Sequence, residues 1–229
     1  SDANTLLLIH GGEAIASGTT GSGATFVDSG NTGHTVTENG NAQRETEQEF
    51  KFTPDATGYF FDGDPSTAMS VPNHADWDLF GSNSDNWTIS LFARWTAVPT
   101  ASQQFFSQSE AGGERWSMYH SVGAGIKLIL VSGSSAVLHL SGGTEVTDTD
   151  WHHIAVCKVA DEYGAYIDGV QTNYLQDDST DTFTAQLYIA SLDFAGNDFP
   201  GYMDEMLIEQ SNVFNAAPNA TPDDTIVVP

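Results

Sequence analysis

Three acidic side chains lie close together near the end of the chain, in the run Asp204-Glu-Met-Leu-Ile-Glu209. Glycoside hydrolysis uses two carboxyl groups that flank one glycosidic bond. The run is expected to be a strand, so Asp204 and Glu205 would point to opposite faces. No opposed carboxyl pair is therefore predicted. The sequence favours a protein that is not an enzyme, with a glycoside hydrolase or polysaccharide lyase as the least favoured alternative.

Histidine and cysteine give no familiar catalytic or metal-binding motif. His152 and His153 are adjacent in an expected strand, so they face opposite sides and cannot bind one metal together. No His-Glu-x-x-His helix, Gly-x-Ser-x-Gly turn or phosphate-binding Gly-rich loop is present. Cys157 is the only cysteine, which excludes an intrachain disulfide and a multi-cysteine zinc site.

Several aromatic side chains are candidates for ligand binding, because glycan binding needs rings beside polar groups on a rim or sheet face. Trp77 lies between two aspartates, and Trp116 follows a Gly-rich turn. Phe92, Arg94 and Tyr166 are expected on the outer face of a sheet. Packing in the interior or against a neighbouring strand is the alternative for each of them.

Strands must position these side chains, because no window of a dozen residues has the apolar spacing of a capped helix. Short β-rich runs bounded by turn residues recur instead. Strands are expected at Thr5–His10, Ala24–Val27, Thr35–Glu38, Ala42–Arg44, Gly58–Phe61, Ala68–Val71, Trp87–Trp95, Gln104–Ser109, Trp116–His120, Lys127–Val131, Ala136–Leu140, His152–Val159, Gly164–Ile167, Leu187–Ala190 and Gly201–Gln210.

The clearest of these runs is Trp87–Trp95, where apolar side chains alternate with Thr88, Ser90, Phe92 and Arg94. A period of two places the apolar set in a core. The run Ile167-Asp-Gly-Val170 predicts a tight hairpin, because Asp-Gly readily supplies positive φ angles. So many short strands indicate an all-β fold, a two-sheet antiparallel β-sandwich of jelly-roll type.

The chain has 229 residues, a length that fits one large β domain. Residues 1–215 are expected to form the sandwich. Residues 216–229 are rich in Pro, Asn and Asp and are expected to form a polar arm or linker. The last apolar residues, Ile226–Val228, could pair with an exposed strand edge.

The charge is strongly negative: 31 acidic residues against 6 basic ones give a net charge of −25. Nucleic acid is excluded as a partner, because binding phosphates requires clustered Lys and Arg. An anionic membrane surface is disfavoured for the same reason. The early apolar run Leu6–Ile9 is too short for a membrane span or a signal-peptide core. The acids serve solubility, cation binding, or both.

Five sets of segments resemble the laminin G-like jelly-roll family of the pentraxin and concanavalin A-like group. They follow the family's usual order and cover roughly residues 5 to 215. The segments are Phe26–Asn31 with His34–Asn41, Tyr59–Gly63 with Met69–Pro72, Trp87–Trp95, Trp151–Val156 with Ala165–Val170, and Leu187–Ala190 with Gly201–Glu205. The resemblance implies a concanavalin A-like sandwich and is more specific for fold than for function.

The same resemblance implies a structural calcium ion between an early Asp-containing loop and a late Asp-Glu strand. The matching positions here are Asp28, Asn31 and Asp204. Calcium prefers several converging oxygen ligands of this kind. The alternative is that Asp28 and Asn31 only form a turn. Asp62-Gly-Asp64 is a second oxygen-rich loop.

The start of the chain, Leu6–His10 with Asp28–Asn31, looks like copies of the family in marine bacteriophage structural proteins and bacterial surface proteins. This implies a non-catalytic module on a virion surface, as a capsid decoration or fibre-associated protein. Its partners would be viral capsid or other surface-assembly proteins, and glycan adhesion is a further task. The alternative is a calcium-dependent carbohydrate-binding module or lectin, secreted or on a bacterial cell surface.

Overall fold

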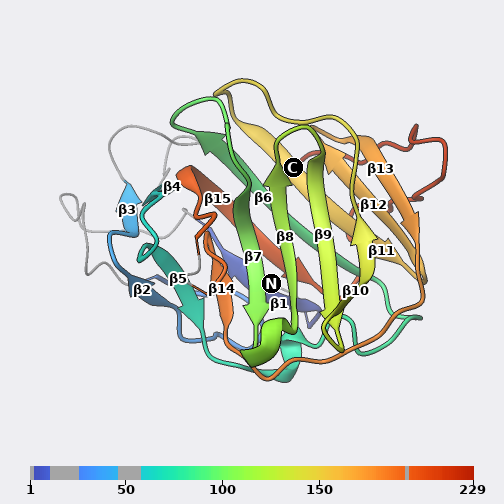
Figure 1. The fold of residues 1–229 in the computed structure, drawn as a ribbon, viewed down its shortest axis with the longest axis horizontal. Coiled ribbons are helices and arrows are strands. Elements are labelled where there is room, and N and C mark those ends of the chain that lie inside the picture. The colour runs from blue at the N-terminus through green and yellow to red at the C-terminus, as the bar shows by residue number, and fades with distance from the viewer. Residues whose placement is uncertain (1–2, 11–25, 46–57, 194–195) are drawn as a thin grey trace.

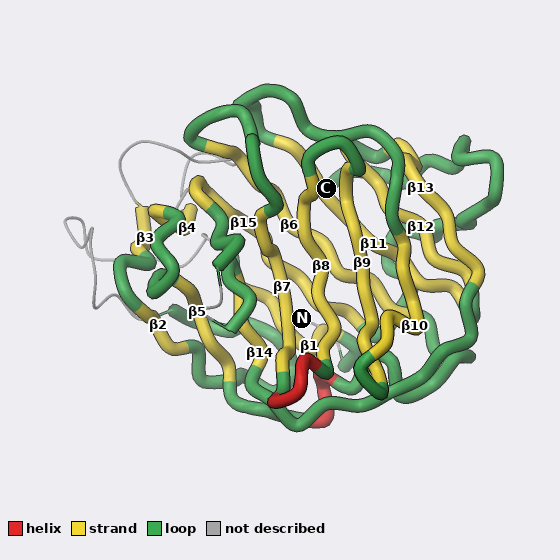
Figure 2. The backbone as a smooth tube through the Cα atoms, in the orientation of Figure 1, coloured by secondary structure: helices red, strands yellow, loops and turns green. Residues whose placement is uncertain are grey.

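The computed structural model describes residues 3–10, 26–45, 58–193 and 196–229. Regular structure in these ranges is β, apart from two short 3₁₀ turns at Ala75–Trp77 and Ala111–Gly113. The strands form two antiparallel sheets that pack face to face (Figure 1). Both 3₁₀ turns, red in Figure 2, lie at one end of the sandwich. The predicted all-β antiparallel sandwich is confirmed.

The larger sheet has eight strands and the smaller sheet seven. The larger sheet runs β13 (Val170–Gln176), β12 (Glu162–Ile167), β11 (His152–Val159), β6 (Trp87–Trp95), β15 (Pro200–Glu209), β4 (Gly58–Asp62), β3 (Gln43–Glu45), with β1 (Thr5–Ile9) also paired to β15. The smaller sheet runs β10 (Ser135–Leu140), β9 (Gly125–Ser132), β8 (Arg115–Ser121), β7 (Gln103–Ser109), β14 (Leu187–Ile189), β5 (Ala68–Val71), β2 (Thr37–Asn39).

Strand β6 lies near the middle of the larger sheet and has the bounds that its alternation predicts. Its inner side chains all belong to the core between the sheets: Trp87, Ile89, Leu91, Ala93 and Trp95. Burial on this side follows from the period of two. The outer side chains of Thr88, Ser90 and Phe92 are buried as well, so another part of the chain must cover this face.

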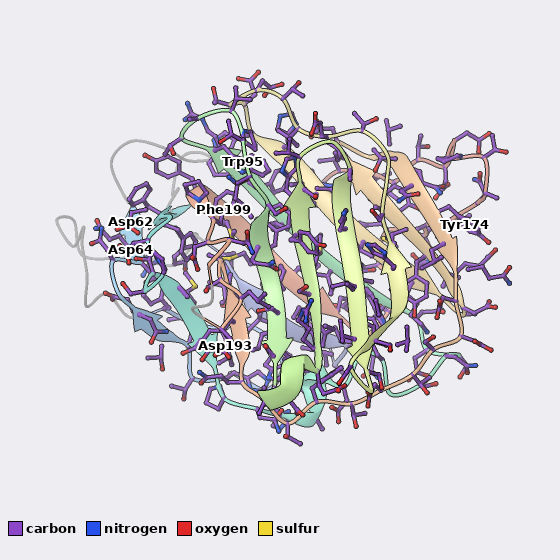
Figure 3. The ribbon with its side chains drawn as sticks, in the orientation of Figure 1. Asp62, Asp64, Trp95, Tyr174, Asp193 and Phe199 are labelled. Carbon is purple, nitrogen blue, oxygen red and sulfur yellow. The ribbon has the colours of Figure 1, made fainter. Side chains whose placement is uncertain are left out.

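Large aromatic rings fill the space between the sheets. Trp95 packs against Phe105 and Phe199, with ring centroids 6.0 and 5.2 Å apart, and Figure 3 shows Trp95 and Phe199 side by side. Burying a side chain such as Phe105 or Phe199 contributes about 1.5–3 kcal/mol. The core therefore provides a rigid support for both outer faces.

The segment after β15 covers the outer face of the larger sheet. Phe214, Ala216 and Ile226 pack there against Ala155, Cys157 and Tyr166. The hydroxyl of Tyr166 donates to Asp224 Oδ2 at 2.7 Å. We call residues 211–226 the C-terminal cover. In Figure 1 the red C-terminal segment extends past the β13 edge.

The C-terminal cover pairs with the edge of its own sheet. Thr225 forms a bridge to Val170, and the Ile226 N–H donates to the Gly169 carbonyl at 2.8 Å. The strand-edge pairing expected for Ile226–Val228 thus includes Ile226 and lies within this chain.

The predicted hairpin at Ile167–Val170 is confirmed. Asp168 and Gly169 have φ angles of 50° and 82°, both in the left-handed region that a type I′ turn requires. The strand that follows this turn, β13, was not expected, because its sequence is polar and mixed; it is an edge strand, and most of its residues are only half-buried.

One expected strand, Ala24–Val27, lies partly outside the described residues. Ala24 and Thr25 lie outside the described residues, and Val27 forms an isolated bridge to Thr35.

None of the helical segments in the described part of the chain has the length and apolar character needed to span a bilayer.

Candidate functional site

The two tryptophans expected to form ligand platforms are in the interior. Trp77 and Trp116 are both 0% exposed. Trp77 Nε1 donates to the Pro72 carbonyl at 3.0 Å, and Trp116 Nε1 donates to Gln108 Oε1 at 2.7 Å. Their polar atoms are satisfied and their faces are covered, so neither ring offers a surface for a ligand.

The candidates on the outer face of the larger sheet are covered too. Phe92 packs against the His153 ring at 5.0 Å, and that ring packs against Phe214 at 5.4 Å. Tyr166 is 0% exposed beneath the C-terminal cover. Arg94 is half-buried, and its Nε donates to the Thr149 carbonyl at 3.0 Å. A ligand would reach Phe92 or Tyr166 only by displacing the C-terminal cover.

Asp28, the first expected calcium ligand, is buried and organises the loop that contains it. Its Oδ1 accepts hydrogen bonds from the N–H groups of Leu8 (2.9 Å) and Gly30 (2.7 Å). Its Oδ2 accepts one from the N–H of His34 at 2.7 Å. These three bonds give the buried carboxylate a structural role in fixing the loop to β1.

The other two expected ligands have different surroundings. Asn31 is exposed, and its N–H donates to the Thr5 carbonyl. The Leu8 N–H donates to Asp28, and the Leu8 carbonyl accepts a hydrogen bond from the Ser29 N–H. Strand β1 pairs with β15 along its other edge. Strand β1 therefore lies between the Asp28 loop and the strand that carries Asp204. Calcium binding by this set stays a prediction.

The oxygen-rich loop at Asp62–Asp64 forms a local turn at the end of β4 (Figure 3). Asp62 Oδ1 accepts the Asp64 N–H at 3.0 Å, and Asp64 Oδ1 accepts the Ser66 N–H at 2.9 Å. Burial raises the pKa of Asp62, but the hydrogen bonds it accepts outweigh this and the net shift is downward; the hydrogen bonds from Ser66 lower the pKa of Asp64. The side chains thus stabilise the turn that leads to β5.

Asp204 and Glu209 occupy positions that are far apart along β15. Asp204 pairs with Phe92, and Glu209 pairs with Thr88, so four residues of β6 separate the two positions. At about 3.3 Å per residue this is roughly 13 Å, whereas hydrolase carboxyl pairs are about 5–9.5 Å apart. A bulge follows Asp204, and Glu205 within it has a φ angle of 47°.

A pocket of about 170 Å³ opens on the outer face of the smaller sheet. Strands β7, β8 and β9 form its floor, and the segment between β14 and β15 forms one wall. We call it the outer-face pocket. It is lined by Ser102, Gln104, Arg115, Ser117, Tyr119, Ile129, Leu192 and Asn197.

Alternation in β8 explains how this pocket arises. Trp116 and Met118 point into the core, so Arg115, Ser117 and Tyr119 point outward. Sequence reasoning selected Trp116 as the ligand candidate in this strand and missed its neighbours. The same period of two that identifies the core of β6 would have identified the outward set in β8.

Gln104 is the most informative residue of the pocket. It is only 3% exposed, and its Oε1 has no hydrogen-bond partner among the described residues. Its backbone N–H donates to the Asn197 carbonyl at 2.8 Å, which fixes its position. A buried acceptor without a donor costs about 1–3 kcal/mol. This acceptor is covered by its neighbours, so a ligand hydroxyl or amine would satisfy it after the Gln104 side chain turns toward the pocket.

Tyr119 and two cations complete the site. Lys127 Nζ lies 5.9 Å from the centroid of the Tyr119 ring, and Arg115 Nη1 donates to the Gly113 carbonyl at 2.9 Å. Burial raises the pKa of Tyr119, and the nearby Arg115 partly offsets that rise. Two of the chain's six basic residues thus lie on this face of a very acidic protein.

Two antiparallel sheets that pack face to face form a sandwich of the concanavalin A-like type. The model of the laminin G type described as "Concanavalin A-like lectin/glucanases superfamily" matches residues 61–216. The chain belongs to this superfamily, and the resemblance read from its motifs is confirmed. No curated protein sequence matches the chain.

Solved structures share the fold at low sequence identity. The binding domain of Paraclostridial Mosquitocidal Protein 1 has a TM-score of 0.66 and 11% identity, over 91% of this chain and 49% of that one. The botulinum neurotoxin DC binding domain, solved in complex with SialylT, gives 0.61 and 11%, over 91% and 48%. Domain 4 of AbnA, an extracellular arabinanase from Geobacillus stearothermophilus, solved with arabinotriose, gives 0.57 and 18%, over 80% and 86%.

This chain spans about half the length of the toxin binding domains it matches. At such identities the likeness shows the shared fold. The neighbours named here are binding or carbohydrate-bound domains, although the superfamily also includes glucanases.

Proposed function

We propose that this chain is a non-catalytic carbohydrate-binding module that holds a short or terminal glycan in the outer-face pocket. The observation that carries the proposal is the buried Gln104 Oε1, an acceptor without a partner among the described residues, in the same pocket as Tyr119 and Arg115. An acceptor, a ring face and several N–H donors match the hydroxyl groups and the C–H face of a sugar.

Each pocket group has a separate task in this proposal. Gln104 Oε1 accepts a hydrogen bond from a sugar hydroxyl, and Arg115 donates to ring or carboxylate oxygens. The ring of Tyr119 packs against the apolar face of the sugar. The volume of about 170 Å³ is below the roughly 300 Å³ at which pockets for drug-sized ligands begin. It therefore suits one sugar unit better than a long buried chain.

Two observations support binding without catalysis. The matching solved structures include toxin binding domains and a domain in complex with arabinotriose. The buried carboxylates Asp204 and Glu209 occupy positions that the β6 register keeps far apart, which argues against an acid–base pair made of these two residues.

We further propose that the module is displayed on the surface of an assembly, as a capsid decoration or fibre-associated protein of a bacteriophage virion. The resemblance of its early segments to phage structural proteins supports this setting, in which its protein partners are capsid components. Mass spectrometry of purified virions should find the chain at a fixed ratio to the capsid protein. Recovery only as free protein would contradict this setting and leave glycan binding intact.

A glycan array with matched variants tests the binding proposal. The wild-type protein should bind a defined set of glycans, and Tyr119→Ala should weaken that binding at least tenfold, since the ring would no longer face the sugar. Tyr174→Ala is the matched control, because Tyr174 is a half-buried tyrosine on β13 of the other sheet. A blank wild-type array, or equal binding by Tyr119→Ala, would overturn the proposal.

Repeating the array with calcium and with a chelator tests the secreted, calcium-dependent lectin that is the alternative setting. The calcium set Asp28, Asn31 and Asp204 involves no residue of the outer-face pocket. We therefore expect the binding itself to survive chelation.

A further inference from the structure

Two histidines and one aspartate from distant parts of the chain meet next to Trp77. His34 lies at the end of the loop that Asp28 organises, and its N–H donates to Asp28 Oδ2. His74 and Asp76 lie at the start of the 3₁₀ turn Ala75–Trp77. The three side chains join the early loop to the connection that follows β5.

The ligand atoms of the three side chains are close enough for one ion. His34 Nε2 lies 2.8 Å from Asp76 Oδ2, and His74 Nδ1 lies 3.0 Å from Asp76 Oδ1. One ligand atom from each of the three residues lies within 4.8 Å of the other two. Bond lengths of about 2.0–2.1 Å in a tetrahedral site place ligand atoms roughly 3.3 Å apart. Only small side-chain shifts separate the observed arrangement from that geometry.

His74 Nδ1 faces two groups of Asp76, the backbone N–H and the carboxylate. The backbone N–H of Asp76 donates to this atom at 3.2 Å, which requires a free lone pair on the nitrogen. The carboxylate oxygen Asp76 Oδ1 faces the same nitrogen at 3.0 Å, and it also offers a lone pair. A neutral imidazole can accept the N–H or donate to the oxygen, but it cannot do both through one atom. A cation held between His74 Nδ1 and Asp76 Oδ1 would use the lone pair that accepts the N–H, and would replace that hydrogen bond.

Neighbouring side chains hold the three groups in place. The His34 ring packs against Trp77 at 4.6 Å and against the edge of His74 at 4.8 Å. Thr32 Oγ1 donates to Asp76 Oδ2 at 2.8 Å. Outer contacts of this kind orient ligands at metal sites and raise affinity. The His74 side chain is 46% exposed, so an ion can enter from solvent.

We propose that His34, His74 and Asp76 form a binding site for a divalent transition-metal ion such as Zn²⁺. Two imidazole nitrogens and one carboxylate are a ligand set typical of zinc and its neighbours. Calcium takes oxygen ligands instead. The three residues leave a fourth position, on the exposed side, for water or a donor from a ligand. This proposal goes beyond glycan binding, since none of the three lines the outer-face pocket.

The bound ion would connect the loop that carries His34 to the turn that carries His74 and Asp76. Because such a site exists in the folded chain and not in the unfolded one, metal binding adds its free energy to the stability of the fold. The expected signature is a metal-dependent rise in the thermal midpoint.

Calorimetric titration of tag-free, metal-stripped protein with ZnCl₂ tests the site. The wild type should bind one Zn²⁺ per chain and unfold at a higher temperature with zinc, and excess CaCl₂ should not compete. His74→Ala and Asp76→Asn should each weaken zinc binding at least tenfold. His139→Ala is the control, because His139 is exposed on β10 and outside the cluster, and it should bind as the wild type does.

Two results would overturn the site: the absence of saturable zinc binding near one equivalent in the wild type, or unchanged binding in both cluster variants. Cobalt gives a second readout that does not depend on variant folding. Co²⁺ added to the wild type should produce the visible absorption of a low-symmetry site with nitrogen ligands, and zinc should abolish that absorption. A spectrum identical to that of aqueous Co²⁺ would also refute the proposal. Glycan binding is measured in parallel, so failure of this site and failure of the outer-face pocket are distinguishable.

Discussion

The two outer faces of the sandwich differ in what the chain does with them. The larger sheet has apolar residues on its outer face, among them Phe92, Ala155 and Tyr166, and the C-terminal cover buries them. The smaller sheet carries Ser117, Tyr119 and other polar groups on its outer face, and a pocket remains open there. The chemistry of the outward positions thus separates a face that serves stability from a face available for a ligand.

Removing the C-terminal cover should produce the largest effect. Ending the chain at Gln210 exposes the apolar outer face of the larger sheet, and each large apolar side chain that loses burial costs about 1.5–3 kcal/mol. We expect the free energy of unfolding to fall by about 3 kcal/mol or more in urea denaturation. Removing only Val228 and Pro229 should cost far less, since Ile226 keeps its place. Equal stability of the wild type and the long truncation would show that the cover is dispensable.

The rate at which a thiol reagent labels Cys157 measures how well the C-terminal cover protects this buried residue. Burial raises the pKa of Cys157 to about 12, and only the thiolate reacts with thiol reagents. Cys157 should therefore be labelled slowly at pH 8 in the native protein and at least tenfold faster in the long truncation. Labelling is followed by absorbance, with Tyr119→Ala as the control that should leave the rate unchanged. Fast labelling of the intact chain would mean that the cover opens readily.

A conservative substitution in the outer-face pocket should weaken glycan binding without lowering the stability of the fold, unlike removal of the C-terminal cover. Gln104→Met removes a buried acceptor that has no partner among the described residues, so the free energy of unfolding should stay the same or rise by up to about 1 kcal/mol. Glycan binding should weaken about tenfold. Denaturation and glycan affinity are measured on the same preparation. A clear loss of stability would indicate that Gln104 serves the fold, like the residues of the covered face.

The smallest effect is expected at the turn that holds the edge of the cover. His152 lies between Asp148 and Asp168, with contacts of 2.9 and 2.7 Å. Burial lowers its pKa, but the hydrogen bonds that its ring donates to Asp148 and Asp168 outweigh this, and the net shift of the pKa is upward. Its stabilising contribution is therefore present below the unfolded value of about 6.5 and is lost as the pH rises through the folded value.

The variant His152→Gln measures this contribution. It should be less stable than the wild type at pH 6, by at most about 1 kcal/mol because both carboxylates are largely exposed. The difference should shrink by pH 8.5. Denaturation curves at the two pH values provide the test, and a difference that grows with pH would contradict the sign of the shift.

The alternation of apolar and polar side chains along the strands made most of the fold predictable from the sequence. The bounds of β6, β5 and β11 and the Asp168–Gly169 turn follow from side-chain period and turn chemistry. The edge strand β13 could not be found this way, because its half-buried residues are mixed in polarity. The bulge at Glu205 also breaks the period of two, so local alternation could not give the faces of Asp204 and Glu209.

The candidate site was harder to predict than the fold. Large rings such as Trp116 look like ligand platforms in a sequence, but their size makes them better core residues. The side chains of β8 that line the outer-face pocket are the neighbours of Trp116, namely Arg115, Ser117 and Tyr119. The His34–His74–Asp76 cluster depends on a contact between residues some forty positions apart, which no local pattern contains.

The bridge between Thr225 and Val170 affects how copies of the protein behave at high local concentration. An unprotected edge strand is a template on which another polypeptide can add a further strand, and fibres grow in this way. Here the chain's own tail occupies part of that template on β13. Addition of a further strand at this part of β13 is therefore blocked.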